Sequence, residues 1–391
     1  MKRATVAAAL VRSLRLLQTS AVLLSSAVWG TEQTSDRIPI WGEINGRSVT
    51  LFLDTGSETS GLFRNAVERI GLKPHTQGRN FYDLTEEFNW IPAPFTWLSG
   101  PAFQRGRSLI VDRPSFLEDD FDGFIGWPGI SNLVFEFNMQ EAVLRSGFDL
   151  PKAMDDWNRW KLVQGSPVLI FGCAYGTNSV RIGIDTGSEH GVWLSPRRWR
   201  ELRARVRPQA LTLETAWSPT DGLLTREVLR AKRVDVGDLT LTNMPVSEAL
   251  PSEVRAFSGC DAILGMFVFT RLAIISDGSS GSLYTKPVTR PFPDYDYNRL
   301  GAVFVPKDIG ESDDLVAHVI KGSSAYRAGI CDGDVLLKVG IRNVTKWRTD
   351  PTIKLNGFWS QPAGTKLKLT LKRGDKQYET TVTLEEIPAV D

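Results

Sequence analysis

The feature that most restricts how this chain can fold is a pentapeptide that occurs twice. Asp-Thr-Gly-Ser-Glu occupies residues 54–58 and recurs unchanged at residues 185–189 of the 391-residue sequence. Both copies follow an apolar run that begins with Val and ends in Leu-Phe-Leu or Ile-Gly-Ile. A repeat with similar flanks is typical of an internal duplication. We therefore expect two structural units of the same design in one chain.

The likeness extends to both sides of each pentapeptide. Similar Pro-containing apolar segments precede it, at residues 38–42 and 166–172, and a charged segment that we expect to be helical follows it. Each copy closes with Asp, a small residue, two apolar residues and Gly, at residues 122–126 and 261–265. Because the predicted strands are short and separated by turn residues, we expect a mainly β fold.

Residues 1–30 have the pattern of an export signal. A basic region ending at Arg15 precedes the short apolar run 16–28, and small residues such as Gly30 then offer cleavage points. We expect a signal peptide and a protein exported to the bacterial periplasm or outside the cell. An uncleaved membrane anchor and a basic N-terminal helix are the alternatives.

Composition argues against several classes of function. The formal net charge is +1, so no nucleic-acid partner is expected. The three histidines share no metal-ligand spacing, and we expect neither a metal nor a cofactor. The three cysteines are an odd, sparse set, which argues against a disulfide framework, although a bridge between Cys173 and Cys260 stays open.

The repeated Asp suggests a chemistry that needs two carboxyl groups. If Asp54 and Asp185 lie a few ångström apart, they share one proton, because both cannot ionise together at that distance. One carboxylate then acts as a base and the other as an acid. Thr55 and Thr186 are expected to brace the two loops by hydrogen bonds.

The remaining residues of the motif are expected to support this pair. Gly56 and Gly187 permit tight turns and close approach of the backbone. The hydroxyl groups of Ser57 and Ser188 are expected to hold the outer carboxylate oxygens and favour the ionised form. Low pKa values for the pair, and activity at acidic pH, would follow.

These residues resemble those of the aspartic peptidases with retropepsin-like halves, fused in one chain as in the pepsin architecture. The resemblance covers residues 36–286 and implies duplicated acid-protease barrel halves at 36–150 and 151–286. The apolar-apolar-Gly element of each half would pack against the Asp loop. The resemblance rests on the two Asp-Thr-Gly-Ser motifs and the two closing elements, Phe124-Ile125-Gly126 and Ile263-Leu264-Gly265.

The resemblance also implies an activity. A water activated by Asp54 and Asp185 would hydrolyse peptide bonds of polypeptide substrates, which makes the protein an endopeptidase without a cofactor. Since both aspartates belong to one chain, we expect a monomer. A protein of the same fold that binds or scaffolds peptides without cutting them is the alternative.

The family closes a β-hairpin over its substrate, and two segments are candidates for this flap. They are residues 81–100 and 215–225, with Tyr82, Trp97 or Trp217 near a tip. An aromatic residue of the core or surface explains each position equally well.

Residues 287–298 contain three prolines, and we expect them to be a linker. The sequence pattern changes after this segment. Residues 299–391 then predict a strand at 315–320, a short helix within 322–330, and an alternating strand at 366–373 that enters a hairpin turn. This pattern predicts a small separate domain.

This last segment resembles a PDZ domain of the kind attached to exported bacterial peptidases. The resemblance implies binding of peptide C-termini, with the terminal carboxylate held by a backbone loop formed by Leu300, Gly301 and Ala302. A domain that only packs on the rest of the chain is the alternative. The matching stretches are Leu300-Gly301-Ala302-Val303, Gly322-Ser323-Ser324-Ala325, Ala328-Gly329-Ile330 and Gly333-Asp334-Val335-Leu336.

Overall fold

The computed structural model describes Arg37 and most of residues 39–391. Residues 45, 73–80, 85–88, 91–95, 98–105, 113–120, 139–142, 147–148, 153, 176–177, 219, 238, 289–293, 310–311 and 351 are outside the description, and for 81–84, 89–90, 96–97, 106–108, 143–146, 175 and 178 only the backbone is described. The predicted signal peptide and the side chains of Tyr82 and Trp97 therefore lie outside the described residues. No helix among the described residues is long and apolar enough to cross a membrane.

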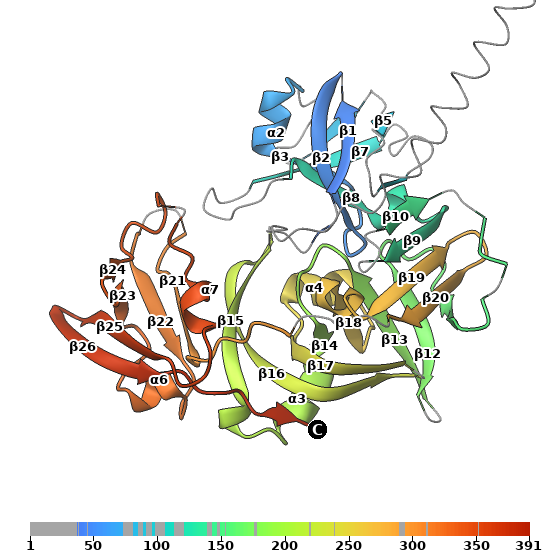
Figure 1. The fold of residues 1–391 in the computed structure, drawn as a ribbon. Helices are drawn as coiled ribbons and strands as arrows, with labels where there is room; N and C mark the ends of the chain where they lie inside the picture. The colour runs from blue at the N-terminus through green and yellow to red at the C-terminus, as the bar shows by residue number, and fades with distance from the viewer. Residues whose placement is uncertain are drawn as a thin grey trace, which may run out of the picture.

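The described chain is mainly β, as expected (Figure 1). We refer to residues 36–150 as the first repeat, 151–286 as the second repeat and 299–391 as the C-terminal segment. The strands of the first repeat lie mostly in one sheet whose described order is β4 (Phe81–Leu84), β7 (Gly106–Val111), β3 (Gly61–Phe63), β8 (Gly123–Gly126), β2 (Arg47–Asp54), β1 (Pro39–Ile44) and β5 (Asn89–Trp90).

A longer sheet contains the second repeat. Its described order is β15 (Leu211–Ser218), β16 (Gly222–Val236), β17 (Leu239–Glu248), β14 (Val192–Leu194), β18 (Ala262–Gly265), β13 (Asn178–Asp185), β12 (Ile170–Tyr175), β11 (Asn158–Leu162), β20 (Ser282–Pro287), β19 (Leu272–Asp277), β9 (Val134–Asn138), β10 (Val143–Ser146) and β6 (Thr96–Trp97).

The third sheet belongs to the C-terminal segment. Its described strands are β21 (Ala302–Pro306), β22 (Leu315–Val319), β23 (Val335–Val339), β25 (Lys366–Arg373) and β26 (Lys376–Thr383), with β24 (Arg342–Asn343) beside β23. The described helices are α2 (Arg64–Arg69), α3 (Pro196–Arg203), α4 (Pro251–Ala256), α5 (Met266–Phe269), α6 (Ser324–Arg327) and α7 (Asn356–Trp359), with 3-10 turns at Trp127–Gly129 and Pro208–Ala210.

The duplicated sequence patterns form the same local structures. Strands β2 and β13 both end at the Asp of the pentapeptide, and the charged segments that follow are the helices α2 and α3. The closing elements are β8 and β18, which run parallel to β2 and β13. In this register Asp54 lies opposite Gly126, and Asp185 lies opposite Gly265.

The two repeats share a sheet and a core. Strand β9 of the first repeat pairs antiparallel with β19 of the second, and Phe137 on β9 meets the ring of Phe269 edge to face at 5.5 Å. Strands β9 and β10, expected in the first half, thus lie in the sheet of the second repeat. One continuous apolar core runs through both repeats, so their relative position is fixed by burial.

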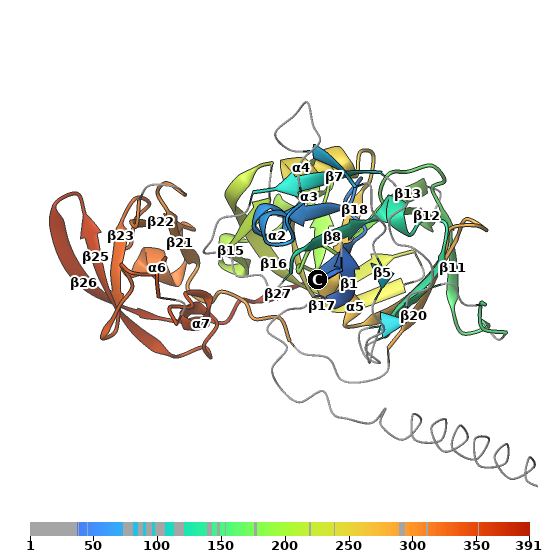
Figure 2. The same ribbon diagram turned by 90° about the horizontal axis from the view of Figure 1, so that it is seen from above.

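The C-terminal segment has its own apolar core, around Leu336, Leu369 and Trp359, and lies beside β15 and β16 (Figures 1 and 2). Its predicted strands and short helix are present, and α6 is capped by Ser323, whose hydroxyl accepts a hydrogen bond from the backbone N–H of Tyr326. The tail strand β27 (Ala389–Val390) pairs with β16 of the second repeat. The tail of the segment is therefore attached to the second repeat.

Candidate active site

The repeated aspartates lie together. The carboxyl groups of Asp54 and Asp185 are hydrogen bonded to one another. The two loops cross so closely that a Cβ on Gly56 would lie 2.5 Å from Cγ of Asp185, and a Cβ on Gly187 would lie 2.5 Å from Cγ of Asp54. Glycine is therefore needed at both positions because each carboxyl group occupies the space of a side chain in the opposite loop.

Two threonines tie the loops to each other, as predicted. The hydroxyl of Thr55 donates to the carbonyl of Ile184 (2.7 Å) and accepts from the N–H of Thr186 (3.1 Å). In return the hydroxyl of Thr186 donates to the carbonyl of Leu53 (2.8 Å) and accepts from the N–H of Thr55 (3.0 Å). Both threonines are buried, so each loop is held by the other repeat.

The two serines act differently from the prediction. The hydroxyl of Ser57 donates to the carbonyl of Thr59, and that of Ser188 accepts from the N–H of His190. The carboxylate oxygens instead receive backbone donors, from Gly56 to Asp54 (3.0 Å) and from Gly187 to Asp185 (2.9 Å). The expectation that the serine hydroxyls hold the carboxylates was wrong, because both hydroxyls form hydrogen bonds within their own turns instead.

The expected low pKa values are also not found. Burial raises the pKa of Asp54, and the charge of Arg37 and the N–H of Gly56 offset part of this effect. Burial, then the charges of Asp54 and Glu253, raise the pKa of Asp185 well above its ordinary value. Both carboxyl groups are therefore harder to ionise than an ordinary Asp, Asp185 the more so, as expected for a buried pair that shares one proton.

Arg37 is a residue that the sequence pattern does not single out. Its guanidinium donates to the carbonyl of Gly187 (2.9 Å), lies 3.8 Å from Glu189 and packs over the ring of Phe52. Arg37, at the start of the first repeat, thus contacts the Asp loop of the second repeat. Its positive charge favours the ionised form of Asp54.

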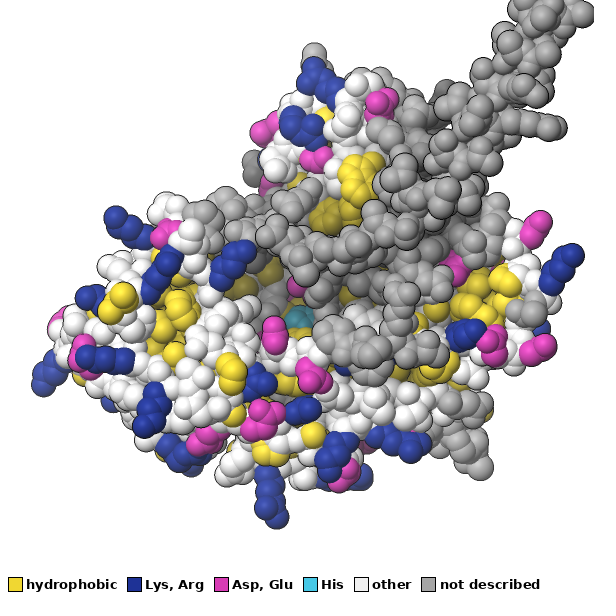
Figure 3. All heavy atoms as spheres, viewed as in Figure 1, with side chains coloured by type: hydrophobic (Ala, Val, Ile, Leu, Met, Phe, Trp, Pro, Cys, Tyr) yellow, Lys and Arg dark blue, Asp and Glu magenta, His cyan; other side chains and the backbone are white. Residues whose placement is uncertain are grey.

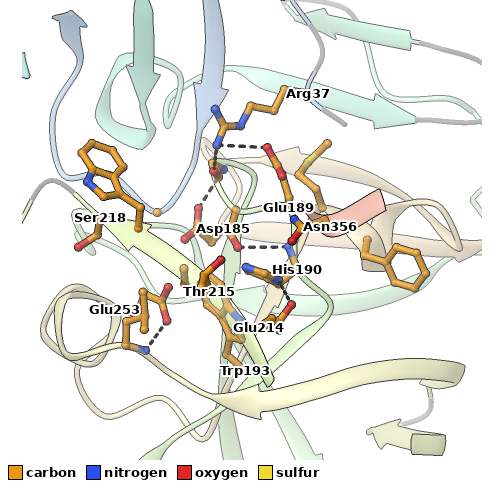
Figure 4. Close-up of a pocket in the computed structure, with 18 of the residues that line it drawn as sticks. Arg37, Asp185, Glu189, His190, Trp193, Glu214, Thr215, Ser218, Glu253 and Asn356 are labelled. Atoms are coloured by element: carbon orange, nitrogen blue, oxygen red, sulfur yellow. Dashed lines mark hydrogen bonds and ion pairs between the residues drawn. The ribbon is translucent and has the colours of Figure 1, made fainter. Parts of the chain in front are cut away.

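The aspartates open into a cavity of about 1350 Å³ (Figure 4). Its walls come from both repeats and from the C-terminal segment, including Val303 of β21 and Trp359 of α7. Acidic side chains and a histidine gather in the middle of the face shown in Figure 3. The site therefore lies where the three sheets meet.

Of the two flap candidates, residues 215–225 form a hairpin of β15 and β16, with Thr215 opposite Thr225 and Ser218 opposite Gly222. Trp217 lines the cavity and packs against the aromatic cluster of the first repeat around Phe52. This hairpin therefore crosses from the second repeat to the first beside the aspartates.

A buried charged cluster beside the aspartates was missed. Glu214 accepts a hydrogen bond from the hydroxyl of Tyr295 (2.6 Å) and lies 3.4 Å from His190 and 3.5 Å from Arg226. Burial opposes ionisation of Glu214, but the charges of His190 and Arg226 and the hydrogen bonds lower its pKa to about 2. Tyr295 belongs to the predicted linker, so this end of the linker is packed into the site.

The loop predicted to bind a peptide C-terminus, residues 300–302, belongs to the C-terminal segment and is separate from the aspartate pair. Leu300 and Ala302 are buried, and Gly301 has a φ of +70°, which favours glycine. The side-chain amide of Asn298 donates to the carbonyls of Leu213 and Ala302, which attaches the loop to β15.

The described residues also bear on metals and disulfides. No group of three or more His, Cys, Asp or Glu among them is placed to hold a metal ion. Cys173, Cys260 and Cys331 are not joined by disulfides in the described part of the chain, so the bridge left open between Cys173 and Cys260 is not formed.

No model of a known protein family matches the chain, and a search of curated proteins finds no significant match.

Proposed function

We propose that this protein is an exported aspartic endopeptidase with two retropepsin-like halves and a C-terminal PDZ domain, in which Asp54 and Asp185 are the catalytic dyad. The observation that carries the proposal is the hydrogen-bonded pair of carboxyl groups held by the reciprocal bonds of Thr55 and Thr186. The chemistry of such a pair suits peptide hydrolysis because it supplies a base and an acid at one point.

In the proposed reaction the two carboxyl groups have different tasks, and the positive charge of Arg37 supports Asp54 as the base. Ionised Asp54 takes a proton from a water as its oxygen attacks the peptide carbonyl carbon. Asp185 gives its proton to the carbonyl oxygen, so a neutral tetrahedral diol forms. Asp54 then protonates the leaving nitrogen, the C–N bond breaks, and Asp185 recovers its proton from a diol hydroxyl. The dyad returns to its starting state, and no metal or covalent intermediate takes part.

The cavity walls suit a polypeptide substrate. The β15–β16 hairpin, with Trp217 on the cavity wall, lies where a flap would cover an extended chain. The C-terminal segment would serve as the peptide-binding module, because β21 is an edge strand of its described sheet and its Val303 lines the same cavity. A peptide with a free C-terminal carboxylate should bind the protein more tightly than the same peptide with an amidated end.

The dyad is tested by Asp54→Asn and Asp185→Asn, which keep the size of the side chain. We expect both variants to lose cleavage of an unfolded protein. Asp112→Asn, which removes an exposed carboxylate paired with Arg64, is the matched control and should cleave normally. Cleavage at the parental rate by both dyad variants would show that the proposal is wrong.

The runner-up function is peptide binding without cleavage. It predicts that the purified protein binds peptides yet cuts none between pH 3 and pH 8.

A further inference from the structure

Glu253 is a carboxyl group in the wall of the same cavity that the proposed reaction does not use. Its side chain is only 9% exposed, and its Oε2 accepts a hydrogen bond from the N–H of Leu250 (2.6 Å) at the start of α4. Figure 4 shows it among the residues lining the cavity with Asp185. Its charge reaches Asp185, since it contributes to the raised pKa of that residue.

This carboxyl group has no counter-ion at contact distance. Among the described residues, no Lys or Arg lies within 4 Å of Glu253, and Leu250 supplies its one hydrogen bond, to Oε2. Burial raises the pKa of Glu253 to about 8, although the charge of Arg226 opposes this shift. A buried carboxyl group without a cation stays protonated near neutral pH, and it ionises readily only when a cation is placed beside it.

The neighbouring charges leave room for a cation. Arg226 is opposite Glu214 in the β15–β16 pair, with Nε 3.5 Å from Oε1, and it packs over the ring of Trp193 at 4.9 Å. Asp221 is likewise paired, with Arg255 at 3.1 Å. These two pairs balance their own charges, so neither supplies a cation at contact distance to Glu253. A cationic group brought into the cavity beside Glu253 would therefore favour its ionised form.

Apolar side chains belong to the same cavity wall as Glu253. Leu250 and Phe257, at the two ends of α4, and Trp193, which is in one apolar cluster with Phe257, line the cavity and are largely buried. Long basic side chains combine a methylene stem, which packs on apolar groups, with a charged end that seeks a carboxylate. This combination of an apolar wall and one acidic group matches lysine or arginine.

We propose that Glu253 and its apolar neighbours form a subsite for a lysine or arginine side chain of the substrate, close to the scissile bond. The inference rests on the proposed peptidase function and adds the substrate class to it. It makes the enzyme selective for basic residues.

The experiment uses peptides that differ at one position, Lys or norleucine, on either side of the cleaved bond. Wild-type protein should cleave the Lys peptide with the larger kcat/KM. Glu253→Gln keeps an oxygen for the N–H of Leu250 and should fold, yet lose roughly 10- to 100-fold in kcat/KM for the Lys peptide. Its cleavage of the norleucine peptide should change little. Asp296→Asn, an exposed carboxylate at the cavity, is the control and should keep the preference.

Binding to Asp54→Asn protein separates the subsite from the chemistry. Fluorescence anisotropy should show a roughly 10- to 100-fold weaker Kd for the Lys peptide when Glu253→Gln is added, with the norleucine peptide unaffected. Equal Kd values for the Lys peptide with and without Glu253→Gln would overturn the subsite even if wild-type protein is an active peptidase. Absence of cleavage together with the predicted binding difference would instead reject the peptidase and retain the subsite.

Discussion

Replacing Thr55 by Val tests whether the reciprocal threonine bonds hold the two repeats together. The substitution keeps the branched shape and removes only the hydroxyl. Two buried groups of the other repeat then lose their partner, the carbonyl of Ile184 and the N–H of Thr186. Each buried group left without a hydrogen bond costs about 1–3 kcal/mol, so the two together cost about 2–6 kcal/mol.

Thr55→Ser is the matched control because it keeps the hydroxyl and removes one methyl group. Loss of a buried methyl costs about 1 kcal/mol. The Val variant should therefore be less stable than the Ser variant by about 1–5 kcal/mol, a large share of the ~5–15 kcal/mol that stabilises a typical domain.

Urea unfolding followed by tryptophan fluorescence measures this difference, since Trp127, Trp160 and Trp199 lie in the core that runs through both repeats. We expect the midpoint to fall for Thr55→Val at a constant slope, which identifies a change of stability. If Thr55→Val unfolds at the same urea concentration as Thr55→Ser, the hydroxyl does not fix the loops and the reasoning fails.

Three further predictions concern the charges and close contacts of the site. Arg37→Gln removes the charge that opposes the raised pKa of Asp54, so the acid limb of the pH–rate profile should move to higher pH; an unmoved limb contradicts this. Gly187→Ala places a methyl group 2.5 Å from Cγ of Asp54 and should lower kcat at least about 100-fold, as steady-state kinetics would reveal. Tyr295→Phe removes a hydrogen bond to ionised Glu214 and should cost about 1.5–3 kcal/mol at pH 7. Because the folded pKa of Glu214 is lowered to about 2, its stabilisation is present above pH 4.5 and disappears as pH falls through 2, so the difference between Tyr295→Phe and the parent should shrink over that range of unfolding measurements.

The sequence predicted what the duplication itself encodes. A repeated motif at the end of a strand is enough to predict that Asp54 and Asp185 meet and that Thr55 and Thr186 brace their loops. The predicted strands and helices around the motif are also found, because short apolar runs and capping residues specify them locally.

Other parts of the site depend on hydrogen-bond partners and strand register, which the sequence pattern does not specify. The sequence does not show which acceptor the hydroxyl of Ser57 takes, and the geometry of its turn selects the carbonyl of Thr59. The register of β15 and β16 sets Glu214 against Arg226, and the path of the linker brings Tyr295 to the same point. These contacts join residues that are far apart in the sequence and at no regular spacing, so no sequence motif could have revealed them.

The unequal surroundings of the two aspartates have a consequence for how a substrate lies in the site. A pair of identical subunits would accept a peptide running in either direction, because a twofold rotation exchanges the two halves. Here the charge of Arg37 acts on Asp54 and that of Glu253 on Asp185. The two repeats differ in sequence, so no rotation of the protein exchanges one half for the other. Fusion in one chain therefore gives the cavity a polarity: the amino and carboxyl ends of a bound peptide should each have a fixed side.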